Sequence, residues 1–128
     1  ASENIAWQLL EDVLKEDKYN LLSFTHQILL KNLLQHTDKL SQEEAQYVNQ
    51  HASVDFVIYY KLNKQPVLIV EVDGFAFHEN NQAQQARDAM KNDILKKYEL
   101  PLVRLQTTGS GEDENIKSKL DEVLNKKH

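Results

Sequence analysis

Hydrophobic residues recur along the chain with two different periods, and these periods predict its secondary structure. A spacing of three or four residues indicates helices over residues 2–15 and 82–98, and over a last segment that follows the polar loop TTGSGEDEN. The β-branched and aromatic runs SVDFVIYY and PVLIVEVD indicate two strands. The turn-like KLNKQ between them favours an antiparallel hairpin.

The remaining segments complete an alternation of helices and strands. LLSFTHQILLKNLL is ambiguous, and we favour a strand followed by a short helix. Ser41 and Glu44 form a capping-box pattern that predicts a short helix, and LPLVRLQ predicts a third strand begun by Pro101. We therefore expect an α/β fold with a mixed central sheet flanked by helices, in a single domain over residues 1–128. The expected apolar stripe of the helix over 82–98 is Ala83, Ala86, Met90, Ile94 and Tyr98.

Composition narrows the classes of protein. The 128 residues suit one domain. The formal net charge of −5 argues against a strong sequence-independent grip on nucleic acid, although divalent cations would cancel local negative charge. There are no cysteines, which excludes disulfides and thiolate metal sites and fits a cytoplasmic location. No apolar run approaches the ~20 residues of a membrane span. Because the chain starts inside a helical pattern, we expect it to be part of a longer protein.

Three carboxylates are expected at one end of the predicted hairpin. Asp55 lies near the start of the first strand, and Glu71 and Asp73 lie on one face near the end of the second. The apolar run PVLIV before Glu71 indicates a central strand covered on both faces, where charges are costly unless they are paired or bound to a metal. Oxygen ligands of this kind favour Mg²⁺ or Mn²⁺, which can activate water and neutralise a phosphodiester.

Basic residues follow these carboxylates along the chain. Gly74 permits a sharp exit from the strand, and His78 could then take a proton from water or hydrogen-bond a phosphate. Arg87 and Lys91 are spaced i,i+4 on the next helix and either could contact a scissile phosphate, with Asp88 orienting Lys91. The alternatives are an ordinary loop histidine and a solvated basic helix face.

The segments SVDFVI, VLIVEVDGFAFH, ARDAMKNDIL and LPLVRL together resemble the PD-(D/E)XK nuclease superfamily. The most similar branch comprises domains related to very-short-patch-repair endonucleases, often fused to superfamily I helicases. The resemblance implies a restriction-endonuclease-like fold, Mg²⁺-dependent hydrolysis of DNA and a helicase domain in the same polypeptide. The site residues that this resemblance implies are Asp55 as the first acidic metal ligand, Glu71 and Asp73 in the D/E-X-K element, the Val72 carbonyl as a further metal ligand, His78 after the DG pair and Glu3 on the opening helix.

The chain departs from the family pattern at one position. Asp73 occupies the place of the motif's lysine, and Lys91 is our candidate to replace that lysine from the following helix. Our first hypothesis is a metal-dependent DNA endonuclease. The alternative is a catalytically inactive module of the same fold that binds nucleic acid or protein, which the acidic charge and the missing lysine favour. A structural interaction domain that never contacts nucleic acid is a third class.

Overall fold

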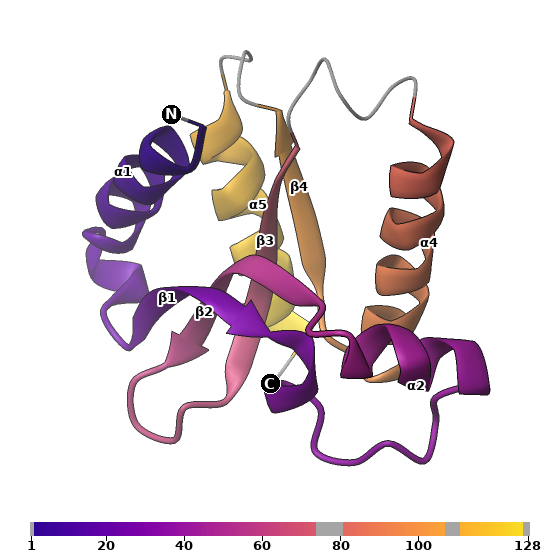
Figure 1. The fold of residues 1–128 in the computed structure, drawn as a ribbon. Helices are drawn as coiled ribbons and strands as arrows, with labels where there is room; N and C mark the ends of the chain where they lie inside the picture. Colours follow the sequence, from indigo (N-terminus) through magenta and orange to yellow (C-terminus); the bar gives the residue numbers. More distant parts are fainter. Residues whose placement is uncertain (1, 74–80, 107–110, 127–128) are drawn as a thin grey trace.

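Four strands form one sheet, and helices lie on both of its faces (Figure 1). The structure is a computed structural model that describes residues 2–73, 81–106 and 111–126. The elements are α1 (Ser2–Leu14), β1 (Leu22–Leu29), α2 (Gln42–Asn49), β2 (Ser53–Tyr60), β3 (Pro66–Asp73), α4 (Gln82–Lys97), β4 (Leu102–Gln106) and α5 (Glu112–Lys126), with one-turn 3-10 helices at Asp17–Tyr19 and Leu30–Asn32. The predicted order of helices and strands is confirmed, including the strand and short helix within the ambiguous apolar segment.

The sheet is mixed, as the sequence predicts. Its strand order is β1-β2-β3-β4, and the first three strands are antiparallel while β3 and β4 are parallel. The predicted hairpin joins β2 to β3, and its turn is closed by a hydrogen bond from the Tyr60 N–H to the Gln65 carbonyl at 3.0 Å. β2 and β3 are the central strands of the sheet, and their antiparallel pairing brings the start of β2 next to the end of β3.

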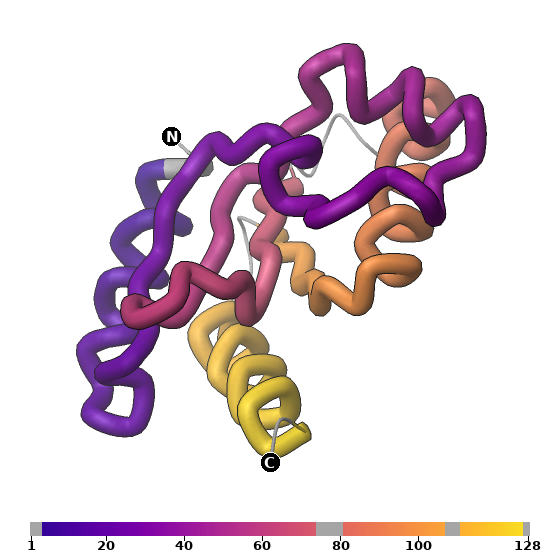
Figure 2. Tube along the Cα trace, turned by 90° about the horizontal axis from the view of Figure 1, so that it is seen from below, coloured from indigo at the N-terminus to yellow at the C-terminus, as the bar shows by residue number. Residues whose placement is uncertain are grey.

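Each face of the sheet has its own apolar core. Figure 2 shows α1 and α5 separated from α2 and α4 by the strands. The core under α1 and α5 consists of Ala6, Leu10, Val13, Tyr19, Leu22, Phe56, Ile58, Val67, Leu68, Val70, Leu105, Ile116, Leu120 and Val123. The core under α2 and α4 consists of Leu30, Leu34, Val48, Val54, Val57, Ile69, Ile94 and Leu95. Both faces of β3 are therefore covered, which explains its almost unbroken apolar sequence.

The face under α4 changes from apolar to charged along its length. Val57 and Ile69 pack with the C-terminal half of α4, whereas Glu71 and Asp73 lie further along the same face of β3. The apolar stripe predicted for α4 is therefore wrong at its first two positions, Ala83 and Ala86. Ala83 and Ala86 are exposed, and the first half of α4 contacts the charged end of the sheet through a polar pair, Asp88 with Arg104 at 3.8 Å.

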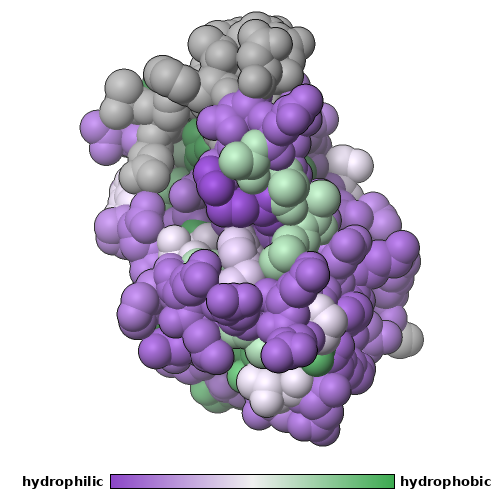
Figure 3. Space-filling model, turned by 45° about the vertical axis from the view of Figure 1, so that its right-hand side comes forward, coloured by the Kyte–Doolittle hydropathy of each residue, from purple (hydrophilic) through white to green (hydrophobic). Residues whose placement is uncertain are grey.

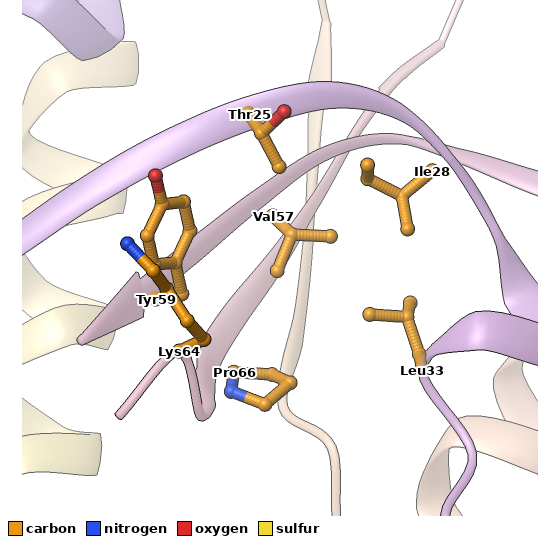
Figure 4. Close-up of a pocket in the computed structure, with 7 residues that line it drawn as sticks. All are labelled: Thr25, Ile28, Leu33, Val57, Tyr59, Lys64 and Pro66. Carbon is orange, nitrogen blue, oxygen red and sulfur yellow. The ribbon is translucent and has the colours of Figure 1, made fainter. Parts of the chain in front are cut away.

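An apolar pocket of about 280 Å³ opens near the hairpin turn, at the opposite end of this face. Figure 4 shows Val57 at its centre, with Ile28 and Leu33 on one side and Tyr59 and Lys64 on the other. The pocket contains one charged side chain and no acid, so it offers little for recognising a polar ligand.

The predicted capping box at α2 is present and links α2 to α4. The Glu44 N–H donates to Ser41 Oγ at 3.2 Å, and Glu44 Oε1 accepts from the Ser41 N–H at 2.8 Å and from Lys97 Nζ at 2.5 Å. The hydrogen bond from Lys97 is the largest cause of a lowered pKa for the Glu44 carboxyl, and the hydrogen bond from the Ser41 N–H lowers that pKa further. The box therefore fixes both the start of α2 and its position against α4.

Replacing Ser41 with alanine is expected to lower the free energy of unfolding by about 1 kcal/mol, because the first turn of α2 loses a hydrogen-bond acceptor. Urea unfolding followed by circular dichroism measures the change. Ser118→Ala is the matched control, since Ser118 lies exposed within α5 and caps nothing. Equal stability of the two variants would contradict a contribution from the capping box.

Candidate functional site

At the open end of the hairpin, the carboxylates of Asp55 and Glu71 each accept a hydrogen bond from a backbone N–H of the opposite strand. The Asp55 N–H donates to Glu71 Oε2 at 2.8 Å, and the Val72 N–H donates to Asp55 Oδ2 at 2.8 Å. Regular pairing of β2 with β3 reaches only Phe56 and Val70, so these carboxylates replace the backbone ladder beyond that point. The two side chains that the sequence placed together are therefore fixed reciprocally by backbone donors.

Lys91 reaches this pair from α4. Its Nζ lies 2.5 Å from Glu71 Oε1 and 2.7 Å from the Ser53 carbonyl oxygen. The side chains of Lys91 and Glu71 are only 12% and 6% exposed. The structure thus brings Asp55, Glu71 and Lys91 together, with the lysine supplied by α4.

The electrostatics of Glu71 are set by opposing effects. Burial raises the pKa of its carboxyl above the ordinary value, the Lys91 ammonium opposes that rise, and the negative charge of Asp55 adds to it. A buried carboxylate of this kind stays charged only through its partners. Glu71 and Lys91 therefore act as one unit.

Asp73 belongs to a different ionic cluster. Arg104 on β4 lies 3.2 Å from Asp73 and 3.8 Å from Asp88, and it also donates to Asn92 Oδ1 at 2.8 Å. Sequence reasoning missed Arg104, although an arginine inside the apolar strand LVRLQ was a usable signal, because such a charge requires a partner. Parallel pairing places Arg104 beside Glu71.

The expected convergence of three carboxylates is not found. Across residues 2–73, 81–106 and 111–126, no three side chains from His, Asp and Glu form a group that could hold a metal ion. Asp73 is paired with Arg104, so Asp55 and Glu71 remain as a pair. Asp88 also accepts from Gln84 at 2.9 Å, and Lys91 is oriented by Glu71 and Ser53 rather than by Asp88 as expected.

The other predicted residues are placed as follows. Arg87 is exposed, and its Nη2 donates to Gln84 Oε1 at 2.8 Å. For Val72 the structure shows the N–H in contact with Asp55. His78 and the side chain of Glu3 lie outside the described residues.

The donor set fits a hard divalent cation. Mg²⁺ in proteins is commonly held by one or two carboxylates, with water and substrate phosphate filling its other positions. Asp55 Oδ1 has no hydrogen-bond partner within the described part of the chain, and each carboxylate oxygen of Glu71 has a second lone pair besides the one used in the contact described above. Asp55 and Glu71 are therefore the residues that could hold such an ion.

The arrangement defines an α/β fold with a partly buried carboxylate–lysine cluster at the end of two central strands. A family model described as "Protein of unknown function (DUF2726)" matches residues 1–124, and the chain belongs to this family. Neither curated proteins nor solved structures gave a match to the chain. In the described ranges, no helix is long and apolar enough to cross a membrane.

Proposed function

We propose that the protein is a metal-dependent phosphodiesterase that hydrolyses DNA. The observation that carries the proposal is the cluster of Asp55, Glu71 and Lys91, two carboxylates and an ammonium held together at the end of a hairpin. Phosphodiester hydrolysis needs oxygen ligands for a divalent cation and a positive charge for the phosphate. This cluster supplies both within one site.

Each residue has a role that follows from its contacts. Asp55 and Glu71 would hold Mg²⁺ or Mn²⁺, which supplies an activated water and charge neutralisation when bound. Among the described residues, Lys91 uses two of its three N–H donors, on Glu71 and on the Ser53 carbonyl. The third N–H is left to donate to a phosphate oxygen of the substrate, and the two fixed acceptors hold the ammonium in position for it.

The setting of this activity is proposed from the sequence alone. The resemblance described above supports a nuclease module of a longer, cytoplasmic protein that also carries a helicase-like domain. One observation favours the alternative of an inactive binding module: Asp73, at the motif's lysine position, is committed to an ion pair with Arg104. Cleavage and binding must therefore be measured separately.

The test is cleavage of labelled single-stranded DNA, double-stranded DNA and RNA in Mg²⁺, Mn²⁺ or EDTA. The native chain is expected to cut DNA only with a divalent cation, and Asp55→Asn and Glu71→Gln are expected to abolish cutting. Asp93→Asn and Glu43→Gln are matched controls at exposed positions outside the cluster, and both are expected to retain activity. Circular dichroism confirms that each variant is folded.

Two results would reject the proposal. A folded native chain that binds DNA but never cuts it would identify an inactive binding module. A folded chain that neither binds nor cuts nucleic acid would identify a structural interaction domain.

A further inference from the structure

A pocket of about 320 Å³ lies beside Lys91, between the end of α2 and the N-terminal half of α4. Its size is at the small end of the range of about 300–1,000 Å³ that is usual for ligand pockets. Tyr47 and His51 line it from α2 and the residues after it, while Gln84, Arg87 and Lys91 line it from α4. The pocket thus shares Lys91 with the proposed catalytic cluster.

The charge of this pocket is opposite to that of the chain. Arg87 and Lys91 are cations and none of its lining residues is acidic, whereas the chain carries 20 acidic residues against 15 Lys and Arg. Two other pockets differ from it in charge. The pocket near the hairpin turn is apolar, and a pocket of about 380 Å³ is lined by both Lys39 and Glu99. A cationic pocket without acids on an acidic protein favours an anion.

The pocket also contains hydrogen-bond donors for which the described part of the chain provides no acceptor. Arg87 donates one N–H to Gln84, and a guanidinium has five. Burial raises the pKa of the Tyr47 phenol, so its hydroxyl stays protonated. Within the described ranges that hydroxyl has no hydrogen-bond partner, although the charges of Lys91, Glu71, Asp88 and Arg87 all act on it. Neutral and charged donors around one small space are the groups that bind phosphate oxygens.

The surrounding surface is compatible with a polyanion. Figure 3 brings the α4 side of Figure 1 forward and shows a mainly hydrophilic face. Ala83 and Ala86 are exposed there, so small side chains on α4 leave room beside Arg87. A strand of nucleic acid lying along α4 would therefore meet polar and small residues rather than an apolar patch.

We propose that this pocket binds a backbone phosphate of the nucleic acid next to the scissile one, through Arg87 with Tyr47 and His51. The inference rests on the proposed function, because it places the scissile phosphate at Asp55, Glu71 and Lys91. Lys91, shared by both sites, then lies between two consecutive phosphates. Arg87 and Tyr47 set the position of the strand and take no part in the chemical step.

The test measures binding of a labelled oligothymidylate by fluorescence anisotropy in EDTA, where no cleavage occurs, over a series of salt concentrations. Arg87→Gln is expected to raise Kd by about 10- to 100-fold, the loss expected for charge-assisted hydrogen bonds. It is also expected to reduce the slope of log Kd against log salt by about one, as removal of one phosphate contact does. Arg87→Lys should retain the slope of log Kd against log salt. Tyr47→Phe should raise Kd and leave that slope unchanged, because it removes a hydroxyl and no charge.

Lys96→Gln is the control, because Lys96 is exposed on the same helix and lies outside the pocket, so its loss changes net charge alone. In cleavage assays, Arg87→Gln is expected to raise KM with little change in kcat, since the contact is made equally in ground and transition states. Equal effects of Arg87→Gln and Lys96→Gln would overturn the inference, and so would a native chain that binds no oligonucleotide.

Inorganic phosphate and thymidine monophosphate separate the two possible sources of the phosphate. Weak competition by both supports a backbone phosphate, whereas binding of either as tight as the oligonucleotide would assign the pocket to a free ligand and overturn the inference. The two proposals fail separately. Arg87-dependent binding without any cleavage would support the phosphate pocket and reject the nuclease proposal. Cleavage with an unchanged KM in Arg87→Gln would support the nuclease proposal and reject the phosphate pocket.

Discussion

Replacing Lys91 with methionine is expected to lower the free energy of unfolding by about 3–5 kcal/mol at neutral pH in metal-free buffer. Methionine keeps the unbranched apolar stem but removes the ammonium that Glu71 and the Ser53 carbonyl both contact. Glu71 is 6% exposed, so its charge would be left in a nearly dry environment without its cation. Urea unfolding of the two chains measures the loss.

The loss is expected to depend on pH. Burial already raises the pKa of the Glu71 carboxyl in the folded chain, and removal of Lys91 raises that pKa further. An acid whose pKa is higher in the folded state than in the unfolded state stabilises the fold below its unfolded pKa. That contribution is lost as the pH rises through the folded value. The difference between native and Lys91→Met chains should therefore be smaller near pH 5 and larger near pH 8, by about 1.4 kcal/mol for each unit of additional pKa shift.

Two further variants isolate the pair. Lys91→Met/Glu71→Gln is expected to recover most of the lost stability, because no buried charge remains without a partner. Lys96→Met is the control for the substitution itself, since Lys96 is exposed on the same helix. The charge explanation would be contradicted if the stability loss of Lys91→Met did not depend on pH, or if the double variant did not recover it. The Lys91 side chain would then stabilise the fold through packing.

The same substitution bears on the proposed activity. Loss of the donor that Lys91 would offer to a phosphate oxygen is expected to reduce kcat by about 10²–10³, the effect of removing one preorganised donor. The assay is run at a temperature where the variant is folded. An unchanged kcat in folded Lys91→Met would remove Lys91 from the proposed mechanism while leaving its role in stability.

The sequence predicted most of the fold because local signals and the global pattern agree. The two central strands begin and end at the residues that their β-branched runs indicate, and the capping box marks the start of α2 correctly. The first half of α4 was misjudged because Ala83 and Ala86 fit an apolar stripe equally well on a buried or an exposed face. The first half of α4 lies against the charged end of the sheet, and the sequence of the helix alone does not reveal this neighbour.

The sequence predicts the meeting of Asp55 and Glu71, because a hairpin determines it. It does not predict the pairing of Asp73 with Arg104, because that depends on how a distant strand packs. Asp55 and Glu71 had to meet because the hairpin aligns the ends of their strands. Asp73 is on the same face, but the parallel neighbour β4 supplies Arg104, and a sequence gives no register for a strand so far along the chain. Lys91 was identified as a possible substitute, and only the packing of α4 shows that it reaches Glu71.

Replacing Leu68 with alanine is expected to destabilise the domain by about 2–5 kcal/mol. Leu68 is fully buried in the middle of β3 and packs in the core under α1 and α5. Leu62→Ala removes the same atoms from the hairpin turn, where the side chain is 97% exposed, and its effect should stay within about 0.5 kcal/mol. Urea unfolding of both variants makes the comparison. A loss at Leu62 as large as that at Leu68 would show that the hairpin turn is buried in an assembly.

This pair of variants also separates the core from the candidate site. Leu68 and Glu71 lie on opposite faces of the same strand, because side chains alternate and their positions differ by an odd number. The cavity left by Leu68→Ala therefore opens on the side of α1 and α5, away from Asp55, Glu71 and Lys91. Under conditions where the variant remains folded, its kcat is expected to match that of the native chain. A fall in kcat without unfolding would show that packing under α1 and α5 holds the carboxylate pair in place through the strand.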